Sequence, residues 1–298
     1  MAPGGTSGIH RLRVACQTYT WQMVGTRWLG QWEPILDAVA AAGYEGVEVT
    51  WQVLGSWLDR PDDARRACSE RGLELAAVAL SPTSGWTNDA LLADEEALVW
   101  RVLDFVSVFP SPRIGLGGGR LVGEVAYPEE TVPPPSQDDP RRSAAFERML
   151  TRYRATAQRA ASRGVAVHIH PTSTADSLIR VRADYDRLAA GLTDLLASGV
   201  VQLGPDTAHI VRGDQEPAAF VAQYADVIGH IHLKDAGARG GPFLPLGTGD
   251  AGIAQVVRAL QAAGYAGWVV AEEESEAAAA DPSVAVRAAR IYLRGQRL

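Results

Sequence analysis

Short apolar runs alternate with longer amphipathic segments along almost the entire chain. The apolar runs predict β-strands near residues 12–17, 46–50, 75–80, 113–117, 165–170, 199–204, 228–233 and 267–272. The Ala-, Leu- and Arg-rich segments between them predict helices near residues 32–42, 62–72, 90–108, 142–163, 181–197, 216–225, 251–264 and 282–294. Strands that alternate with helices are expected to pair in parallel. Eight such units predict a single α/β domain, the closed (β/α)8 architecture of a TIM barrel.

The joints between helix and strand repeat one pattern. The segments AAGYEGVEVTW and AAGYAGWVVAE are near-copies, and ASRGVAVHI is a third version. In each, a glycine follows the last helical residue, where a left-handed backbone commonly ends a helix. Gly43, Gly164 and Gly264 are therefore expected to terminate three helices, as repeated βα units would require.

Length and composition agree with this architecture. Of the 298 residues, 47% are hydrophobic, which is enough for one barrel core over residues 10–298, with a disordered tail at residues 1–9. The net charge of −7 argues against a nucleic-acid-binding face. No apolar stretch reaches the roughly 18 residues of a membrane span, and no signal-peptide pattern is present, so a soluble, cytoplasmic protein is expected. Cys16 and Cys68 are too few for a disulfide framework.

Two segments depart from the repeat. Residues 120–141 are long, acidic and rich in proline, and are expected to be a disordered insertion, a lid over the barrel mouth or a partner-binding loop. Residues 235–252 follow the seventh strand and are rich in glycine, as expected of a loop that approaches a ligand closely.

Five of the six histidines lie at or just after the ends of apolar runs in one stretch of the chain. They are His168, His170, His209, His230 and His232. Asp206 and Glu272 occupy similar places, and the C-terminal ends of barrel strands form the active-site mouth. Imidazole and carboxylate are ligands for zinc, manganese and cobalt. The alternative is that each histidine is an ordinary core residue with its own hydrogen-bond partners. That alternative would have to hold independently at several strand ends, so the pattern predicts a metal enzyme.

The segments GPDTAH, GHIHLKD, PLGTGD and GYAGWVVAEEE resemble the xylose-isomerase-like barrels of the sugar phosphate isomerase/epimerase superfamily. The order HxH, DTxH and HxHLKD is most similar to the inosose (keto-inositol) dehydratase branch. The resemblance implies one Mn²⁺, Co²⁺, Zn²⁺ or Mg²⁺, held by a residue from each of the last four strands. Carried over to this sequence, those metal ligands are His168, Asp206, His232 and Glu272.

The fifth strand departs from the common family pattern. Most epimerases of the superfamily have a glutamate at its end, whereas this chain has VHIHPT. His168 is expected to replace that glutamate as the ligand, and His170 to bind substrate or exchange a proton, although the reverse assignment stays open. Removing His168 should then weaken metal binding, and removing His170 should cost turnover.

The resemblance implies a divalent-metal-dependent isomerase or epimerase that acts on a keto-sugar or keto-polyol through a metal-stabilised enediolate. An inosose dehydratase-like lyase that eliminates a β-substituent is the alternative. The groups expected to act as acids, bases or electrostatic catalysts are Glu272, His170, His209 and Lys234. The residues expected to bind substrate are Glu48, Trp51, Trp86, His170, His209 and Lys234.

More ordinary interpretations accompany these assignments. Lys234, the only lysine, could form a salt bridge with Asp235, and Glu48 could pair with an arginine. The further glutamates of AEEESE are expected to be a solvated acidic run. An apurinic-site endonuclease and a barrel that only binds are competing classes, and the acidic charge counts against the first. The expected partner is a small carbohydrate or inositol-like molecule, without nucleic acid or membrane, and homo-oligomerisation stays open.

Overall fold

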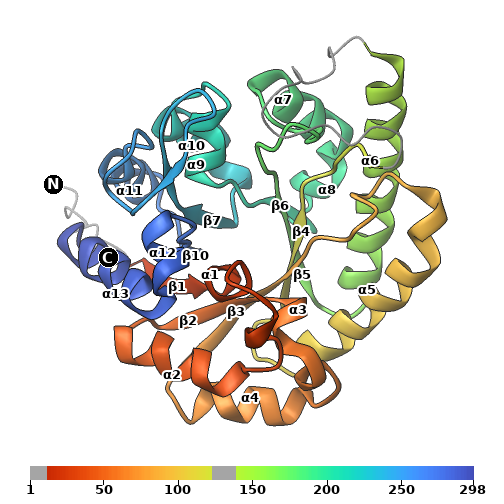
Figure 1. Cartoon of the computed structure of the whole chain (residues 1–298). Coiled ribbons are helices and arrows are strands. Elements are labelled where there is room, and N and C mark those ends of the chain that lie inside the picture. The colour runs from red at the N-terminus through yellow and green to blue at the C-terminus, as the bar shows by residue number, and fades with distance from the viewer. Residues whose placement is uncertain (1–11, 123–138) are drawn as a thin grey trace, which may run out of the picture.

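The computed structural model describes residues 12–122 and 139–298, in which an eight-stranded parallel sheet forms the inner wall of a barrel (Figure 1). Every predicted strand is present. The barrel strands are β1 (Arg13–Gln17), β2 (Gly46–Thr50), β3 (Glu74–Leu80), β4 (Arg113–Gly117), β5 (Ala166–His170), β6 (Val201–Leu203), β7 (His230–Leu233) and β10 (Trp268–Ala271). The predicted α/β class and (β/α)8 architecture are confirmed.

The barrel closes between β6 and β7. The ladder of strands runs β6-β5-β4-β3-β2-β1-β10-β7, and two parallel bridges, Leu203 to Ile228 and Asp206 to His232, join its ends. Backbone hydrogen bonds run from Gly229 N to the Leu203 carbonyl (3.1 Å) and from His232 N to the Pro205 carbonyl (2.9 Å). Two of the predicted metal ligands therefore lie opposite each other at the closing seam.

The outer ring consists of the helices that the apolar pattern predicts. They are α2 (Trp32–Ala42), α4 (Pro61–Ser69), α5 (Leu92–Val106), α6 (Pro140–Ala161), α7 (Arg182–Gly191), α8 (Thr193–Ala197), α10 (Pro217–Tyr224), α11 (Ile253–Ala262) and α13 (Pro282–Gly295). The helix expected over residues 181–197 is divided, because α7 ends before Leu192 and α8 begins after it. Gly43, Gly164 and Gly264 have φ angles of 83°, 67° and 66°, as expected at helix ends.

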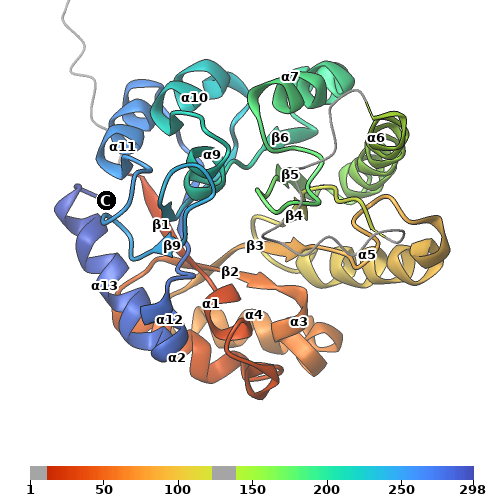
Figure 2. The same ribbon diagram turned by 45° about the horizontal axis from the view of Figure 1, so that its top comes forward.

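Short helices also follow several strands at the barrel mouth, and the sequence pattern did not predict them. They are α1 (Tyr19–Gln22), α3 (Trp51–Leu54), α9 (Thr207–Arg212) and α12 (Glu276–Ala280). Figure 2 shows α1 and α9 inside the ring of outer helices, and α12 beside α13. Single turns of this kind are too short for hydrophobic periodicity to reveal them.

The glycine-rich loop after β7 is ordered by one carboxylate. It contains the two-stranded antiparallel pair β8 (Asp235–Ala236) and β9 (Phe243–Leu244). Asp235 accepts hydrogen bonds from the backbone N–H groups of Gly247 (2.9 Å), Gly249 (3.0 Å) and Ala251 (3.0 Å). Asp235 is thus occupied by its own loop rather than by Lys234, so the expected salt bridge between these neighbours is wrong.

The other predicted irregular segments fall largely outside the described residues. The tail at 1–9 lies there entirely, as does most of the insertion at 120–141. No helix in the described ranges is long and apolar enough to cross a membrane.

Candidate metal and substrate site

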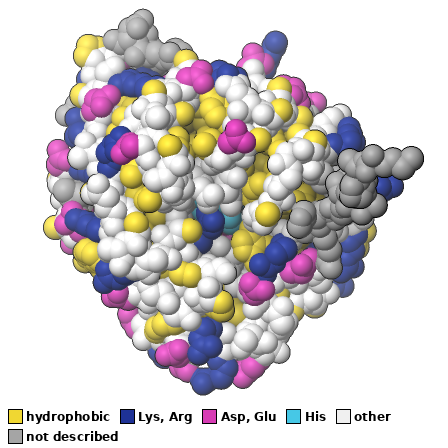
Figure 3. All heavy atoms as spheres, turned by 180° about the vertical axis from the view of Figure 1, so that it is seen from behind, with side chains coloured by type: hydrophobic (Ala, Val, Ile, Leu, Met, Phe, Trp, Pro, Cys, Tyr) yellow, Lys and Arg dark blue, Asp and Glu magenta, His cyan; other side chains and the backbone are white. Residues whose placement is uncertain are grey.

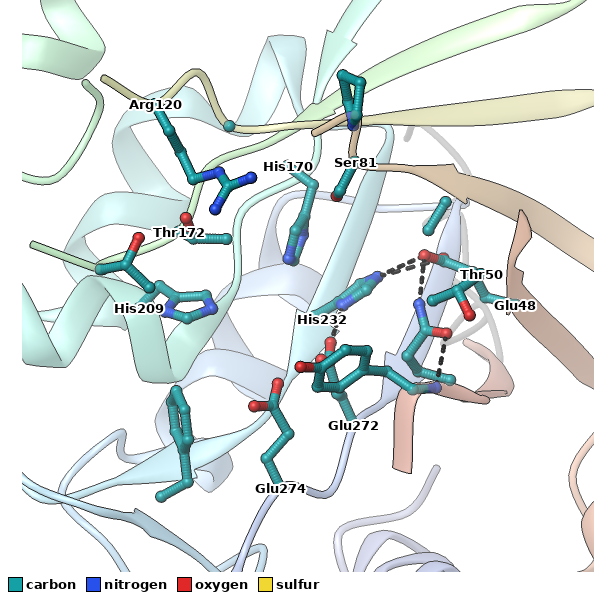
Figure 4. Close-up of a pocket in the computed structure, with 17 residues that line it drawn as sticks. Glu48, Thr50, Ser81, Arg120, His170, Thr172, His209, His232, Glu272 and Glu274 are labelled. Atoms are coloured by element: carbon teal, nitrogen blue, oxygen red, sulfur yellow. Dashed lines mark hydrogen bonds and ion pairs between the residues drawn. The ribbon is translucent and has the colours of Figure 1, made fainter. Parts of the chain in front are cut away.

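A pocket of about 290 Å³ opens at the C-terminal ends of the strands (Figure 4). Its acidic and imidazole lining groups come from the strand ends or the residues after them: Glu48, His170, His209, His232, Glu272 and Glu274. Arg120 also lines the pocket. Hydroxyl-bearing side chains complete much of the wall: Tyr19, Thr50, Ser81, Thr172 and Thr174. Phe243 of the glycine-rich loop adds an apolar surface, so that loop does approach the pocket as the sequence predicted.

Four potential metal ligands converge at this pocket. His170, Asp206, His232 and Glu272 each offer a ligand atom, and these atoms all lie within 4.8 Å of one another. Three of the four are the residues predicted from the sequence. The fourth is His170, where His168 was expected.

The two histidines of β5 lie at different depths. His170 ends the strand and borders the pocket, whereas His168 lies two residues deeper and is completely buried. The ring of His168 stacks on that of His230 with 4.0 Å between centroids and an interplanar angle of 15°. Asp206 and Glu272 are grouped with His170 and not with His168, so the geometry favours His170 over the expected His168 as a ligand.

We call His170 and His232 the mouth layer, and His168 and His230 the buried layer. The buried layer also lies near carboxylate: Glu48, His168, His230 and His232 have ligand atoms within 4.8 Å of one another. A metal must lie close to the plane of each imidazole that binds it, because the nitrogen lone pair lies in that plane. Rings stacked almost in parallel cannot both direct a lone pair at one cation between them, so His168 and His230 cannot bind one cation together.

Glu48 contacts one histidine of each layer. Its carboxylate contacts His232 Nε2 at 3.1 and 3.2 Å, and His230 Nε2 lies in a short contact with Oε2. Gln17 Nε2 donates to Oε1 at 2.7 Å. A carboxylate has about four acceptor positions, and these contacts occupy them. Glu48 was expected to bind a substrate hydroxyl or an arginine, but its partners are two imidazoles and an amide.

His232 bridges two carboxylates. Its Nδ1 makes a short contact with Glu272 Oε2, on the side of the ring opposite to Glu48. Burial lowers the pKa of His232, but Glu48 and Glu272 outweigh burial and raise it to about 10. Burial raises the pKa of Glu272, and the cations Lys234 and His232 bring it well below its usual range.

Lys234 is a buried cation surrounded by acids. Its Nζ lies 3.1 Å from Asp206 Oδ2, 3.4 Å from Glu272 Oε1 and 2.7 Å from Glu274 Oε1. Burial lowers its pKa, but these three carboxylates raise it well above the usual value. Lys234 therefore stays charged and is unsuited to accept a proton. Its Nζ also lies 3.1 Å from His209 Nε2, and Ser173 hydrogen-bonds the other nitrogen of that ring.

Glu274 was expected to belong to a solvated acidic run. It lines the pocket beside Lys234, and burial is the main cause that raises its pKa to about 8. Glu273 is only 3% exposed and accepts a hydrogen bond from Leu246 N at 2.9 Å. The two-residue spacing of Glu272 and Glu274 was the available signal, since it repeats the spacing of the histidine pairs.

The two tryptophans expected to bind substrate do not line the pocket. Trp86 is 3% exposed, donates its indole N–H to the Gly117 carbonyl at 2.8 Å and packs edge-on against Tyr153. Trp51 begins α3 and packs against the hydrophobic core. Neither indole is therefore among the residues that the pocket offers to a substrate, contrary to the expectation from the sequence.

Comparison with known proteins identifies the family. The family described as "Xylose isomerase-like TIM barrel" matches residues 36–295. The chain belongs to this family. An inosose dehydratase from Lacticaseibacillus casei is 26% identical over 281 residues, which cover 88% of each chain. Members of the xylose isomerase-like family include sugar epimerases and inosose dehydratases.

Solved structures agree with the fold. A 3-keto-D-glucoside 4-epimerase from E. coli superposes with a TM-score of 0.71 at 19% identity, covering 95% of this chain and 99% of that one. A D-allulose 3-epimerase from Methylomonas sp. superposes with a TM-score of 0.69 at 17% identity, covering 97% and 98%. At these identities the likeness supports the barrel fold alone.

Proposed function

We propose that this protein is a divalent-metal-dependent enzyme that isomerises or epimerises a keto-sugar or keto-polyol through an enediolate. The observation that carries the proposal is the convergence of ligand atoms from His170, Asp206, His232 and Glu272 within 4.8 Å of one another. All of these residues except Asp206 line the pocket. Two imidazoles and two carboxylates form a donor set that suits Zn²⁺, Co²⁺ or Mn²⁺.

The residues fit a cation chemically. His232 and Glu272 are close enough to share a proton, and a bound cation would replace that proton. When bound, the metal acts as a Lewis acid that polarises a substrate carbonyl and acidifies the neighbouring C–H. His170 then serves as a ligand, which removes it from the predicted acid/base groups.

The remaining pocket groups suit a polyol. Hydroxyls on several walls can donate and accept hydrogen bonds with a polyol. Lys234 does not line the pocket, and its charge acts on the site through Asp206, Glu272 and Glu274. Glu274 and His209 are the pocket groups suited to exchange protons with substrate carbon or oxygen, since neither belongs to the proposed ligand set.

β-Elimination is a second candidate, favoured by the likeness to inosose dehydratases over most of the chain. Loss of a hydroxyl needs a proton donor for the departing oxygen. Burial raises the pKa of Glu274 to about 8 although Lys234 lowers it, which suits Glu274 for that role. On the face seen in Figure 3, acidic and basic side chains are interspersed rather than gathered into a basic surface, which disfavours the endonuclease alternative.

The test is an assay of the metal-loaded protein in D₂O with a panel of keto-sugars and inososes. Isomerisation predicts deuterium at carbon in a product of unchanged composition, whereas elimination predicts a product that has lost one water. Asp206→Asn serves as the inactive control. Metal-loaded protein that exchanges no substrate proton across the panel, or that nicks abasic DNA, would contradict the proposal.

A further inference from the structure

Glu48 contacts His232 from the side opposite to the proposed cation. The Nε2 of His232 faces the Glu48 carboxylate at 3.1 and 3.2 Å, while Nδ1 of the same ring faces Glu272. Nε2 of the ring thus contacts Glu48, and Nδ1 lies on the side of the proposed metal ligands. Figure 4 shows His232 between these two carboxylates.

We propose that Glu48 is a positioning residue of the metal site. It holds His232 in the tautomer and ring orientation that present Nδ1 to the cation. This inference rests on the proposed function, because it requires a cation among His170, Asp206, His232 and Glu272. Imidazoles that bind metals commonly donate their other N–H to a carboxylate, which fixes the ring and increases the basicity of the ligating nitrogen.

The surroundings of Glu48 suit a fixed carboxylate. Glu48 is 1% exposed, and Gln17 Nε2 donates to the same Oε1 that contacts His232. His230 holds Oε2 from the buried layer. The backbone is fixed as well, since Thr18 N donates to the Glu48 carbonyl at 2.9 Å. Partners on both oxygens and on the backbone leave the carboxylate little freedom to turn away from His232.

These contacts also explain why a carboxylate is present inside the barrel. Burying an unpaired carboxylate costs several kcal/mol, and barrel interiors are usually filled by branched apolar side chains. A purely structural role would make Glu48 important for folding but not specifically for metal binding. The two roles therefore separate when metal affinity and stability are measured on the same variants.

The experiment compares Glu48→Gln with Glu273→Gln as a matched control. Glu273 is also a buried carboxylate at the barrel mouth, 3% exposed, but its partners are Leu246 N and the Ser275 hydroxyl rather than an imidazole. Co²⁺ affinity is measured by competition with a chromophoric chelator. Unfolding in the presence of EDTA reports the stability of each metal-free barrel, and ring ¹⁵N spectra of the Zn²⁺-loaded proteins report the tautomer of His232.

Glu48→Gln should weaken Co²⁺ binding by roughly 10–100-fold, while Glu273→Gln should bind as the wild type does. Glu48→Asp, which keeps the charge, should recover part of the loss. In the wild type the ¹⁵N spectrum should show a protonated Nε2 on His232, and in Glu48→Gln a mixture of tautomers. The Asp variant keeps the test usable if the Gln variant folds poorly.

Wild-type Co²⁺ affinity in Glu48→Gln, or an equal loss in Glu48→Gln and Glu273→Gln, would overturn the inference. Wild-type protein that binds no divalent cation would instead refute the proposed function, and this inference with it.

Discussion

The mouth layer and the buried layer contain the same residue type, on the same two strands, yet their surroundings differ. The mouth layer borders the pocket and is grouped with Asp206 and Glu272. In the buried layer the two rings stack on each other, and neither nitrogen of His168 has a partner among the described residues. The same side chain can thus serve as a ligand or as packing, depending on its depth along the strand.

The two layers differ because small residues surround the buried rings, whereas Asp206 and Glu272 lie beside the rings at the mouth. A Cβ added to Gly115 would lie 2.5 Å from His168 Nε2, so the glycine on the neighbouring strand makes room for the buried ring. At the mouth, Asp206 and Glu272 gather around the ligand atoms of His170 and His232, whereas the carboxylate near the buried layer, Glu48, contacts His230. A pair of histidines spaced by two residues therefore identifies a shared face, whereas the neighbouring strands decide which of the two meets the acids.

The largest expected effect is the loss of metal from the mouth. Asp206→Ala and Glu272→Ala each remove a proposed ligand. Metal affinity should therefore fall by more than the roughly 10–100-fold that follows when a residue hydrogen-bonded to a ligand is replaced. Turnover should disappear with the metal, while circular dichroism should show an intact barrel. Elemental analysis measures the occupancy, and full occupancy in both variants would refute the proposed site.

The buried layer should matter for stability. His168→Ala removes a completely buried ring from between tightly packed strands and leaves a cavity. The free energy of unfolding should fall by about 2–3 kcal/mol, near the lower end for large-to-small core changes, because two unsatisfied nitrogens leave with the ring. Denaturant unfolding in EDTA gives the value. An unchanged free energy of unfolding would show that the ring does not pack as described.

Gly115→Ala tests the same packing from the neighbouring strand. The added methyl group collides with His168, so overpacking should cost about 1–3 kcal/mol. In Gly115→Ala/His168→Ala the methyl group occupies space that the ring has left, and the double variant should be more stable than the sum of the single losses predicts. Strict additivity in this cycle would contradict the contact.

Acid should destabilise the barrel partly through the buried layer, alongside His170, whose pKa burial lowers to about 4. Burial lowers the pKa of His230 to about 4, and burial with His230 nearby lowers that of His168 well below its usual value. Because the unfolded chain binds these protons first, stability is present above about pH 6.5 and is lost as pH falls towards 4. Each such histidine contributes a slope of about 1.4 kcal/mol per pH unit in this window. In the metal-free protein, His168→Ala should reduce the slope of the unfolding free energy against pH by an amount that corresponds to at most one proton. An unchanged slope would mean that His168 titrates normally.

The fold was predictable because its signals are local and repeated. Eight apolar runs, the helices between them and the joint glycines such as Gly43 each follow from short stretches of chain. The convergence of Asp206, His232 and Glu272 was also predictable, since the C-terminal ends of parallel barrel strands meet at one mouth.

The remaining features depend on contacts between distant strands. The depth of His168 relative to Asp206 depends on the register of neighbouring strands, which the sequence pattern does not contain. Lys234 takes its partners from other strand ends rather than from Asp235, its neighbour in sequence. Glu274 looked solvated because it follows the last apolar residues of its strand, yet the barrel folds it into the pocket wall.

The most direct test of this account is a pair of metal titrations on His170→Ala and His168→Ala. Both variants lose one imidazole from β5, so they differ only in the layer that is changed. The account predicts that His170→Ala loses Co²⁺ affinity by more than roughly 10-fold, whereas His168→Ala binds Co²⁺ as the wild type does under conditions where it is folded. Retained affinity in His170→Ala together with lost affinity in His168→Ala would place the ligand in the buried layer and contradict it.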